Sequence, residues 1–159
     1  MKRTALALLI LAAAACGRKP AVSGGPACTA PDIAKATFAS SLAIDLSATQ
    51  QTPRGVCIRD LTVGTGAEAV SGSQVSIHYV GTFIDGRQFD ASGPNDPPLE
   101  FQVNAGNIIP GFSEGVVGMK AGGKRQVIIP PALGYGAVAN GPIPANSILV
   151  FTIDLVTVR

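Results

Sequence analysis

The side chains that usually carry covalent or metal-dependent chemistry are scarce in this 159-residue chain. His78 is the single histidine, and strand alternation places it opposite Tyr79, on the outer, solvated face of the predicted sheet. No serine stands in a nucleophile-elbow setting, which argues against Ser-His-Asp hydrolysis, and the Gly-rich stretches match no phosphate-binding loop. Cys28 and Cys57 with one histidine cannot supply four zinc ligands, so we expect no metal site.

The stretch Asn107–Met119 indicates a different kind of site, because it is the best candidate for a helix in a C-terminal half that otherwise reads as strands. Pro110 suits a first helical turn, where the N–H that proline lacks would have no partner. Apolar residues then recur at four- and three-residue steps and make one stripe: Phe112, Val116 and Met119. A short helix with one apolar stripe must lie on another element, and the flanking strands offer a sheet.

The ends of this helix are also predicted from the sequence. Glu114 is expected in the first turn, where a carboxylate suits the helix dipole, and Gly122–Gly123 is expected to stop the helix. Ile108 and Ile109 lead into the first turn. We therefore expect the helix and this entry to form the floor of a small apolar pocket.

Short segments with a two-residue apolar period surround the helix. The predicted strands are Gly55–Val63 with a bulge near Asp60, Gln74–Thr82, Arg87–Asp90, Leu99–Val103, Lys124–Ile129 and Ser147–Val158, with a weakly supported extra strand in Phe38–Leu46. Asp85–Gly86 predicts a hairpin turn. Because the strands are too closely spaced for crossover helices, the expected fold class is α+β, a five- or six-stranded antiparallel sheet packed on one short helix; the family resemblance described below implies that the sheet is wrapped around this helix.

The first 15 residues have the features of a secretory signal. Lys2–Arg3 precedes an unbroken apolar run, Ala5–Ala15, that is too short to span a bilayer comfortably. The run ends in Ala13–Cys16, which resembles the bacterial lipoprotein processing box. This resemblance implies a lipidated Cys16, and an ordinary cleaved signal is the alternative. Since Gly17 stands where an inner-membrane retention signal has Asp, we expect an anchor on the periplasmic face of the outer membrane.

The rest of the chain divides into residues 16–51, a lipid-anchored tether with an N-terminal extension, and residues 52–159, one domain with a single core. Removing Lys2 and Arg3 from 12 basic residues leaves ten, which balance the ten acidic ones. A neutral chain without a basic run is a poor nucleic-acid binder. We expect a monomer that contacts the membrane only through its anchor.

Two cysteines remain after Cys16, and an exported protein can oxidise them. A bridge between Cys28 and Cys57 would close a loop of about 30 residues and contribute about 3–4 kcal/mol in the chain-entropy model. The alternative is two unrelated thiols. We favour the bridge, because unpaired exported thiols are a liability.

Five motifs in order resemble those of FKBP-type peptidyl-prolyl cis-trans isomerases, over roughly residues 52–159. They are Ile77-His-Tyr-Val-Gly-Thr82, Asp85-Gly-Arg-Gln-Phe-Asp90, Ile109-Pro-Gly-Phe-Ser-Glu-Gly115, Leu133-Gly-Tyr-Gly136 and Ile148-Leu-Val-Phe151. The resemblance implies a pocket between helix and sheet and an enzyme that acts, without cofactor, on unfolded or partly folded proline-containing proteins. A binding or chaperone module with little catalysis is the alternative, although Gly134–Pro144 is too short for the inserted flap of chaperone-like members.

Site residues follow from the resemblance position by position. The catalytic group would be Asp90, Tyr135 and the backbone N–H of Ile109, and the substrate-binding group Tyr79, Phe89, Leu99, Phe101, Ile108, Phe112, Ile143 and Phe151. The family usually has Trp where this chain has Phe112 and commonly an aromatic where it has Leu99. Phe101 could instead be core, Tyr135 a loop tyrosine held by its hydroxyl, and Asp90 an ordinary strand-end carboxylate.

Overall fold

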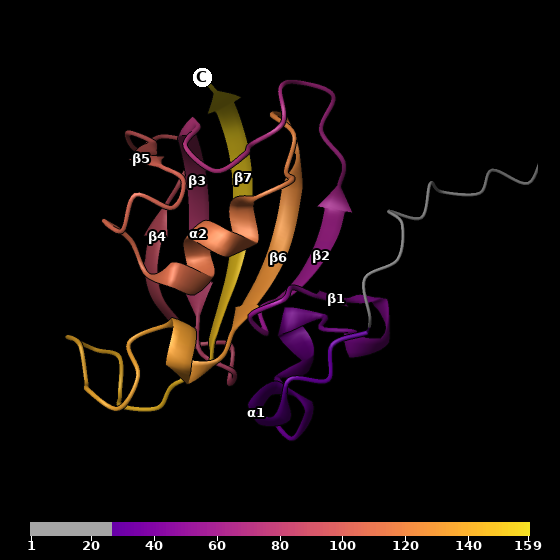
Figure 1. The fold of residues 1–159 in the computed structure, drawn as a ribbon. Helices are drawn as coiled ribbons and strands as arrows, with labels where there is room; N and C mark the ends of the chain where they lie inside the picture. Colours follow the sequence, from indigo (N-terminus) through magenta and orange to yellow (C-terminus); the bar gives the residue numbers. More distant parts are fainter. Residues whose placement is uncertain (1–26) are drawn as a thin grey trace, which may run out of the picture.

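The computed structural model describes residues 27–159, which form an antiparallel sheet with a short helix across one face (Figure 1). The strands are β1 (Gln50–Gln51), β2 (Cys57–Thr62), β3 (Gln74–Thr82), β4 (Gln88–Ser92), β5 (Leu99–Gln102), β6 (Lys124–Ile129) and β7 (Leu149–Val158). They lie in the order β1-β2-β6-β7-β3-β4, and β5 also pairs with β3. The predicted fold class is confirmed, with the two-residue β1 as the additional strand.

Local sequence signals set several of these boundaries. β3 and β6 begin and end at the predicted residues, and the register of β2 shifts between Asp60 and Thr62, where a bulge was expected. The predicted hairpin turn joins β3 to β4. Gly86 adopts a positive φ of 86°, and the Asp85 carboxylate accepts a hydrogen bond from the Arg87 N–H at 2.9 Å.

The helix α2 (Pro110–Val116) starts where predicted but is shorter than expected. Val117 leaves the helical region at φ −56° and ψ 134°, and Gly118 follows with φ 78°, so the prediction that Gly122–Gly123 stops the helix was wrong. Glu114 is the fifth helical residue instead of a first-turn residue, and its carboxylate lies 3.7 Å from the Arg54 guanidinium. It therefore links the helix to the turn before β2.

Two glycines let α2 lie close to the sheet. A Cβ on Gly111 would overlap the side chain of Ile129, and one on Gly115 would overlap Val127. The stripe residues of the helix are buried in the main core, which includes Phe112, Val116, Met119, Val75, Ile77, Val127, Ile129, Leu149, Ile153 and Leu155. The cavity described below lies beside the helix N-terminus.

Arg125 of β6 joins three elements from a buried position. Its guanidinium makes two hydrogen bonds to the Asp60 carboxylate on β2, at 2.6 and 3.1 Å. It also donates to the carbonyls of Gly115 and Val117 at the end of α2, at 3.0 and 2.9 Å. Its side chain is only 5% exposed. The helix thus ends at the Val117–Gly118 turn, and the buried cation satisfies two carbonyls there.

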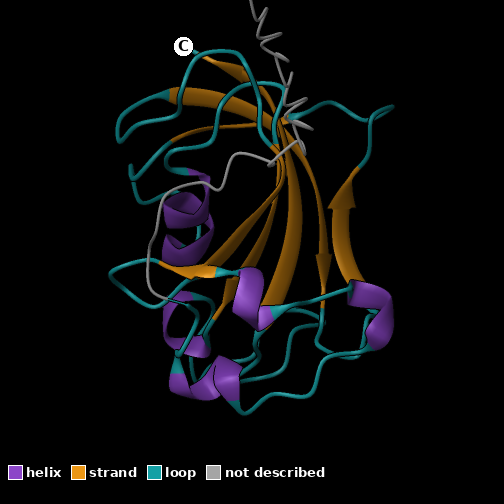
Figure 2. Cartoon of the chain, turned by 90° about the vertical axis from the view of Figure 1, so that its right-hand side faces the viewer, coloured by secondary structure: helices purple, strands orange, loops and turns teal. Residues whose placement is uncertain are grey.

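The segment before β1 packs on the other face of the sheet, so that helical segments lie on both sides of it (Figure 2). It contains α1 (Pro31–Ala34) and two 3₁₀ turns, Ser40–Leu42 and Leu46–Ala48. A second cluster of buried residues joins it to the strands: Cys28, Ala30, Ile33, Cys57, Ile128 and Val150. Cys28 and Cys57 form a disulfide within this cluster, with Cα atoms 5.6 Å apart.

Two expectations for this segment were therefore wrong. Residues 28–36 are not a tether, because Cys28, Ala30 and Ile33 are buried against the sheet. The weak strand in Phe38–Leu46 is absent, because Ala43 turns the chain with φ 47° and the apolar side chains cover Ile128 and Val150 instead of alternating between two faces. The packed unit consequently begins well before residue 52.

The signal segment and Cys16 lie outside the described residues, and so does the first part of the predicted tether. No helix in residues 27–159 is long and apolar enough to cross a membrane.

Asp60→Ala removes the anionic partner of Arg125 and leaves a buried guanidinium without a counter-charge. We expect the free energy of unfolding to fall by about 3 kcal/mol, measured by urea denaturation. Asp154→Ala is the matched control, because it breaks the exposed Lys124–Asp154 pair of neighbouring strands and should cost less than about 1 kcal/mol. Equal losses in the two variants would contradict the role given to Arg125.

Candidate active site

A cavity of about 390 Å³ opens between the N-terminus of α2, the sheet and the loop from β6 to β7. Its walls are mainly apolar, with a few polar groups at the rim. The lining residues are Tyr79, Phe89, Asp90, Leu99, Ile108, Ile109, Phe112, Tyr135, Asn140, Gly141, Pro142, Ile143 and Phe151. Ten of the eleven residues that the sequence predicted for a site are in this set. Their placement is thus given by the structure, whereas their roles remain predictions.

Aromatic rings in edge-to-face contact build the interior of the cavity. Phe112 and Phe151 meet at 4.9 Å between ring centroids and 88° between planes, and Phe89 meets Phe151 at 5.6 Å and 89°. Tyr79 stands edge-on to Phe112 at 5.7 Å. Such contacts fix each ring through its neighbours. The cavity is therefore a preformed apolar box with the size of a small side chain and its adjacent peptide units.

Phe101 is the residue that the prediction misplaced. It is 3% exposed and does not line the cavity. Its ring packs against Phe112 at 5.9 Å, within the main core. Two side chains on the inward face of β5 therefore have different environments. Leu99, at the start of the strand, lines the cavity, whereas Phe101 packs under Phe112, the ring at the floor of the cavity. The alternative interpretation of Phe101 as core was correct.

Gly81 explains how two rings fit over one strand. A Cβ at this position would lie 2.8 Å from the rings of both Phe89 and Phe151. The absent side chain therefore leaves the space in which the two aromatic walls meet. Gly81 is part of the motif Ile77–Thr82, but the alternation of residues along this strand could not show that the glycine makes room for the cavity walls.

Asp90 is held in a defined orientation at the rim. The Tyr79 hydroxyl donates to one carboxylate oxygen at 2.6 Å, and the Ala91 N–H donates to the other at 2.9 Å. Burial, followed by the hydrogen bond to Asp90 and its negative charge, raises the pKa of Tyr79 well above its ordinary value. Tyr79 thus remains a neutral donor, and the carboxylate lies beside the aromatic box.

Two further donors at the cavity have no acceptor within the described part of the chain. The carbonyl of Ile109 accepts hydrogen bonds from the first turn of α2. The N–H of Ile109 donates to no protein group in the described residues. The Tyr135 hydroxyl also lacks a protein partner, so the interpretation of a tyrosine held by its hydroxyl is not supported. Both donors are available to carbonyl groups of a bound chain.

The loop that carries Tyr135 is braced on both sides of that residue. The Gly136 N–H donates to Pro131 at 2.9 Å, and the Gly136 carbonyl accepts from Asn146 at 2.7 Å. Farther along, Asn140 and Ile143 exchange two backbone hydrogen bonds of 2.9 Å across Gly141-Pro142. This tight turn brings Asn140, Gly141 and Pro142 to the rim. The sequence predicted a loop here but did not predict that these three residues lie at the cavity.

His78 is half-buried instead of solvated. Its Nδ1 lies 3.3 Å from the Ser92 hydroxyl on β4, away from the cavity. Among residues 27–159, no three His, Cys, Asp or Glu side chains lie close enough to hold a metal ion.

Comparison with known proteins agrees with this geometry. Residues 66–156 match the family model described as "FKBP-type peptidyl-prolyl cis-trans isomerase". The chain is 45% identical over 109 residues to the FK506-binding protein of Streptomyces anulatus, covering 67% of this chain and 88% of that protein. It is 43% identical over 105 residues to the FK506-binding protein of Neisseria meningitidis serogroup B, covering 65% and 96%.

Two solved structures have a similar fold. The crystal structure of FkpA from Escherichia coli matches with a TM-score of 0.66 and 34% identity, covering 76% of this chain and 55% of that one. AtFKBP13 matches with a TM-score of 0.64 and 35% identity, covering 70% and 98%.

Tyr79→Phe tests the raised pKa of Tyr79 through the pH dependence of stability. Because the folded protein holds the pKa of Tyr79 above its ordinary 10.0, the unfolded chain releases this proton first as pH rises. The free energy of unfolding should be unaffected by Tyr79 ionisation below about pH 9 and should fall above about pH 10. Urea denaturation of both proteins at about pH 8 and about pH 10.5 measures the difference. An equally steep fall in the variant would contradict the assignment.

Proposed function

Because the chain belongs to the FKBP-type peptidyl-prolyl cis-trans isomerase family, we propose that its apolar cavity is the site where X-Pro bonds are isomerised. Family membership makes the chain a peptidyl-prolyl cis-trans isomerase. The residues that perform the reaction, the client proteins and the cellular location go beyond family membership and are proposed below.

The reaction needs stabilisation of a twisted amide. A prolyl peptide bond isomerises over a barrier of about 20 kcal/mol by rotation about C–N, during which the amide loses its resonance. The carbonyl then loses its charge separation, so the twisted state is less polar than either planar isomer. A water-poor apolar cavity therefore favours it, and catalysis by differential binding needs no covalent intermediate.

The observation that carries the proposal is the pair of unpaired donors beside the aromatic box. Phe112, Phe89 and Phe151 would enclose the proline ring. The N–H of Ile109 and the hydroxyl of Tyr135 would each donate to a substrate carbonyl and hold the flanking backbone while the bond rotates. Asp90, oriented by Tyr79, would act electrostatically on the carbonyl that turns. Leu99, Ile108 and Ile143 would complete the apolar wall.

Tyr135→Phe and Asp90→Val should each reduce kcat/KM for an X-Pro test peptide by about three- to thirtyfold, the effect of one lost polar contact. A protease-coupled isomerisation assay measures kcat/KM, and circular dichroism checks that both variants remain folded. Glu100→Gln is the control, since Glu100 is an exposed acid on β5 that does not line the cavity.

Failure of the unsubstituted protein to accelerate isomerisation would overturn the assignment of the cavity as a catalytic site. An aggregation-suppression assay on the same proteins distinguishes the chaperone alternative. If the two variants kept full suppression while losing turnover, the cavity would serve catalysis; the reverse result would favour binding without catalysis.

We propose further that the protein is a lipoprotein of the cell envelope, anchored through Cys16 on the periplasmic face of the outer membrane. The sequence of the first 16 residues supports this, and the Cys28–Cys57 disulfide fits an oxidising compartment. Its clients would be unfolded or partly folded exported proteins that contain proline.

Cys16→Ser should shift the protein from the membrane fraction to the soluble fraction, because the lipid attachment atom is lost. Mass spectrometry of the exported unsubstituted protein should show a mature chain that begins at Cys16 and carries lipid. A soluble chain of unmodified mass would instead indicate an ordinary cleaved signal.

A further inference from the structure

The N-terminal extension, residues 28–48, touches the turn of the β3–β4 hairpin. The Ala39 N–H donates to the Ile84 carbonyl at 2.8 Å. A Cβ on Gly86 would lie 2.8 Å from the Ser41 hydroxyl, so the extension also contacts the tip of the turn. The extension precedes residues 66–156, where the family model matches. This contact is therefore additional to the matched domain.

The hairpin carries two pocket residues on a weakly held strand. β4 lies at the edge of the sheet and pairs only with β3. Its register shifts beside Phe89, because Gly81 pairs with Asp90 while Thr82 pairs with Gln88. A bulged edge strand has fewer ladder hydrogen bonds to fix its position. Phe89 and Asp90 consequently depend on contacts outside the ladder.

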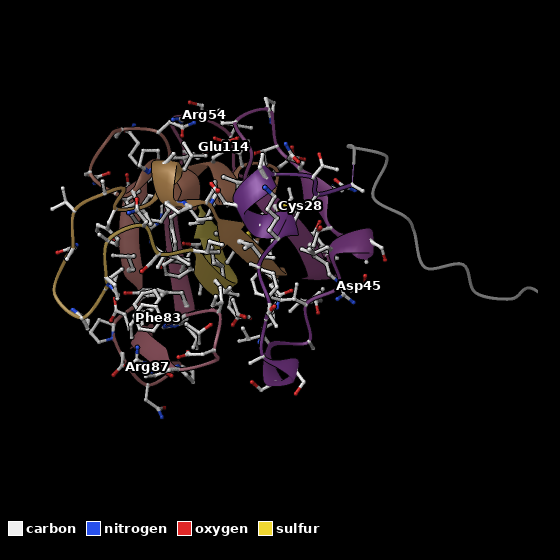
Figure 3. All side chains as sticks on the ribbon, turned by 90° about the horizontal axis from the view of Figure 1, so that it is seen from below. Cys28, Asp45, Arg54, Phe83, Arg87 and Glu114 are labelled. Atoms are coloured by element: carbon white, nitrogen blue, oxygen red, sulfur yellow. A yellow bond between two sulfur atoms is a disulfide. The ribbon has the colours of Figure 1, made fainter. Side chains whose placement is uncertain are left out.

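A path of ring contacts connects the turn to the pocket. Phe83, next to Ile84, is 8% exposed, and its ring lies 5.0 Å from that of Phe89. The Arg87 guanidinium lies over the Phe83 ring, 4.9 Å from the ring centroid (Figure 3). Phe89 in turn packs against Phe151. Movement of the turn would therefore be transmitted to the aromatic box.

We propose that the extension is a positioning element of the isomerase site, which holds Phe89 and Asp90 in place through the Ala39–Ile84 hydrogen bond and the Ser41–Gly86 contact. Ala39 and Ser41 touch no substrate and act only through the hairpin. The inference rests on the proposed function of the cavity. It assigns to the extension a part in turnover in addition to its part in covering the sheet.

Ala39→Pro breaks the hydrogen bond without changing the backbone angle at position 39, because Ala39 has φ −60°, which proline adopts. The substitution deletes the N–H donor and places the proline ring against the Ile84 carbonyl, so the turn must move away. The loss of one hydrogen bond should lower kcat/KM for an X-Pro peptide by about two- to tenfold. Amide hydrogen exchange in residues 84–92 should also become faster, a local effect that general destabilisation of the extension would not produce.

Asp45→Ala is the matched control within the extension. It removes two hydrogen bonds that Ser47 donates to Asp45, at 3.0 and 2.6 Å. Asp45 lies far from Phe83 and Arg87 in the view from below (Figure 3). The control should therefore leave kcat/KM and exchange in residues 84–92 unchanged. A folded Ala39→Pro protein with the kcat/KM of the unsubstituted enzyme would overturn the proposal.

A second pair of variants decides the question if Ala39→Pro does not fold. Gly86→Ala places a Cβ against Ser41, and the double variant Gly86→Ala/Ser41→Gly removes that overlap while keeping the same backbone strain at position 86. The double variant should recover part of the kcat/KM that the single variant loses, and no recovery would refute the contact. An inactive unsubstituted protein would instead refute the proposed function.

Discussion

The buried guanidinium of Arg125 fixes the relation between the helix and the sheet on which the cavity depends. A charge this deep is tolerated only when paired and hydrogen-bonded, and here one carboxylate and two helix carbonyls meet both needs. Because the two carbonyls lie at the end of α2, the same contact ties this end of the helix to β6 and β2. The glycines of α2 then set how close the helix comes to the sheet. The other end of the helix, with Ile109, is placed at the cavity as a result.

The cavity combines rigid apolar walls with very few polar groups. Each ring of the box touches another ring, and the carboxylate at its rim is already bound by a hydroxyl and an amide. In the proposed reaction, little reorganisation would accompany substrate entry, and the binding energy could act on the rotating bond. The proposed chemistry thus rests on the shape and the apolar walls of the cavity, which suits a reaction that makes no new covalent bond.

Much of this arrangement could be predicted from sequence because local signals coincide with tertiary ones. The alternation in β3, the hairpin signal at Asp85–Gly86 and the proline that opens α2 each settle one element. What failed was decided by turn chemistry and by tertiary packing. The end of α2 lies at the Val117–Gly118 turn, one glycine earlier than the predicted Gly122–Gly123 stop, and Phe101 is buried against Phe112 below the cavity. No period in the extension could show that it covers Ile128 and Val150.

The extension covers the face of the sheet opposite α2, and this packing affects how the chain folds. Leu42 accepts a hydrogen bond from Gln126, 84 residues later, and the buried cluster around Ile33 includes Val150 of the last strand. These two contacts of the extension can thus form only when nearly the whole chain is present. Contacts this remote in sequence carry a large loop-closure cost before any gain, which is typical of slow folding. The protein combines a fold of long-range contacts with an activity that speeds the isomerisation of prolyl peptide bonds.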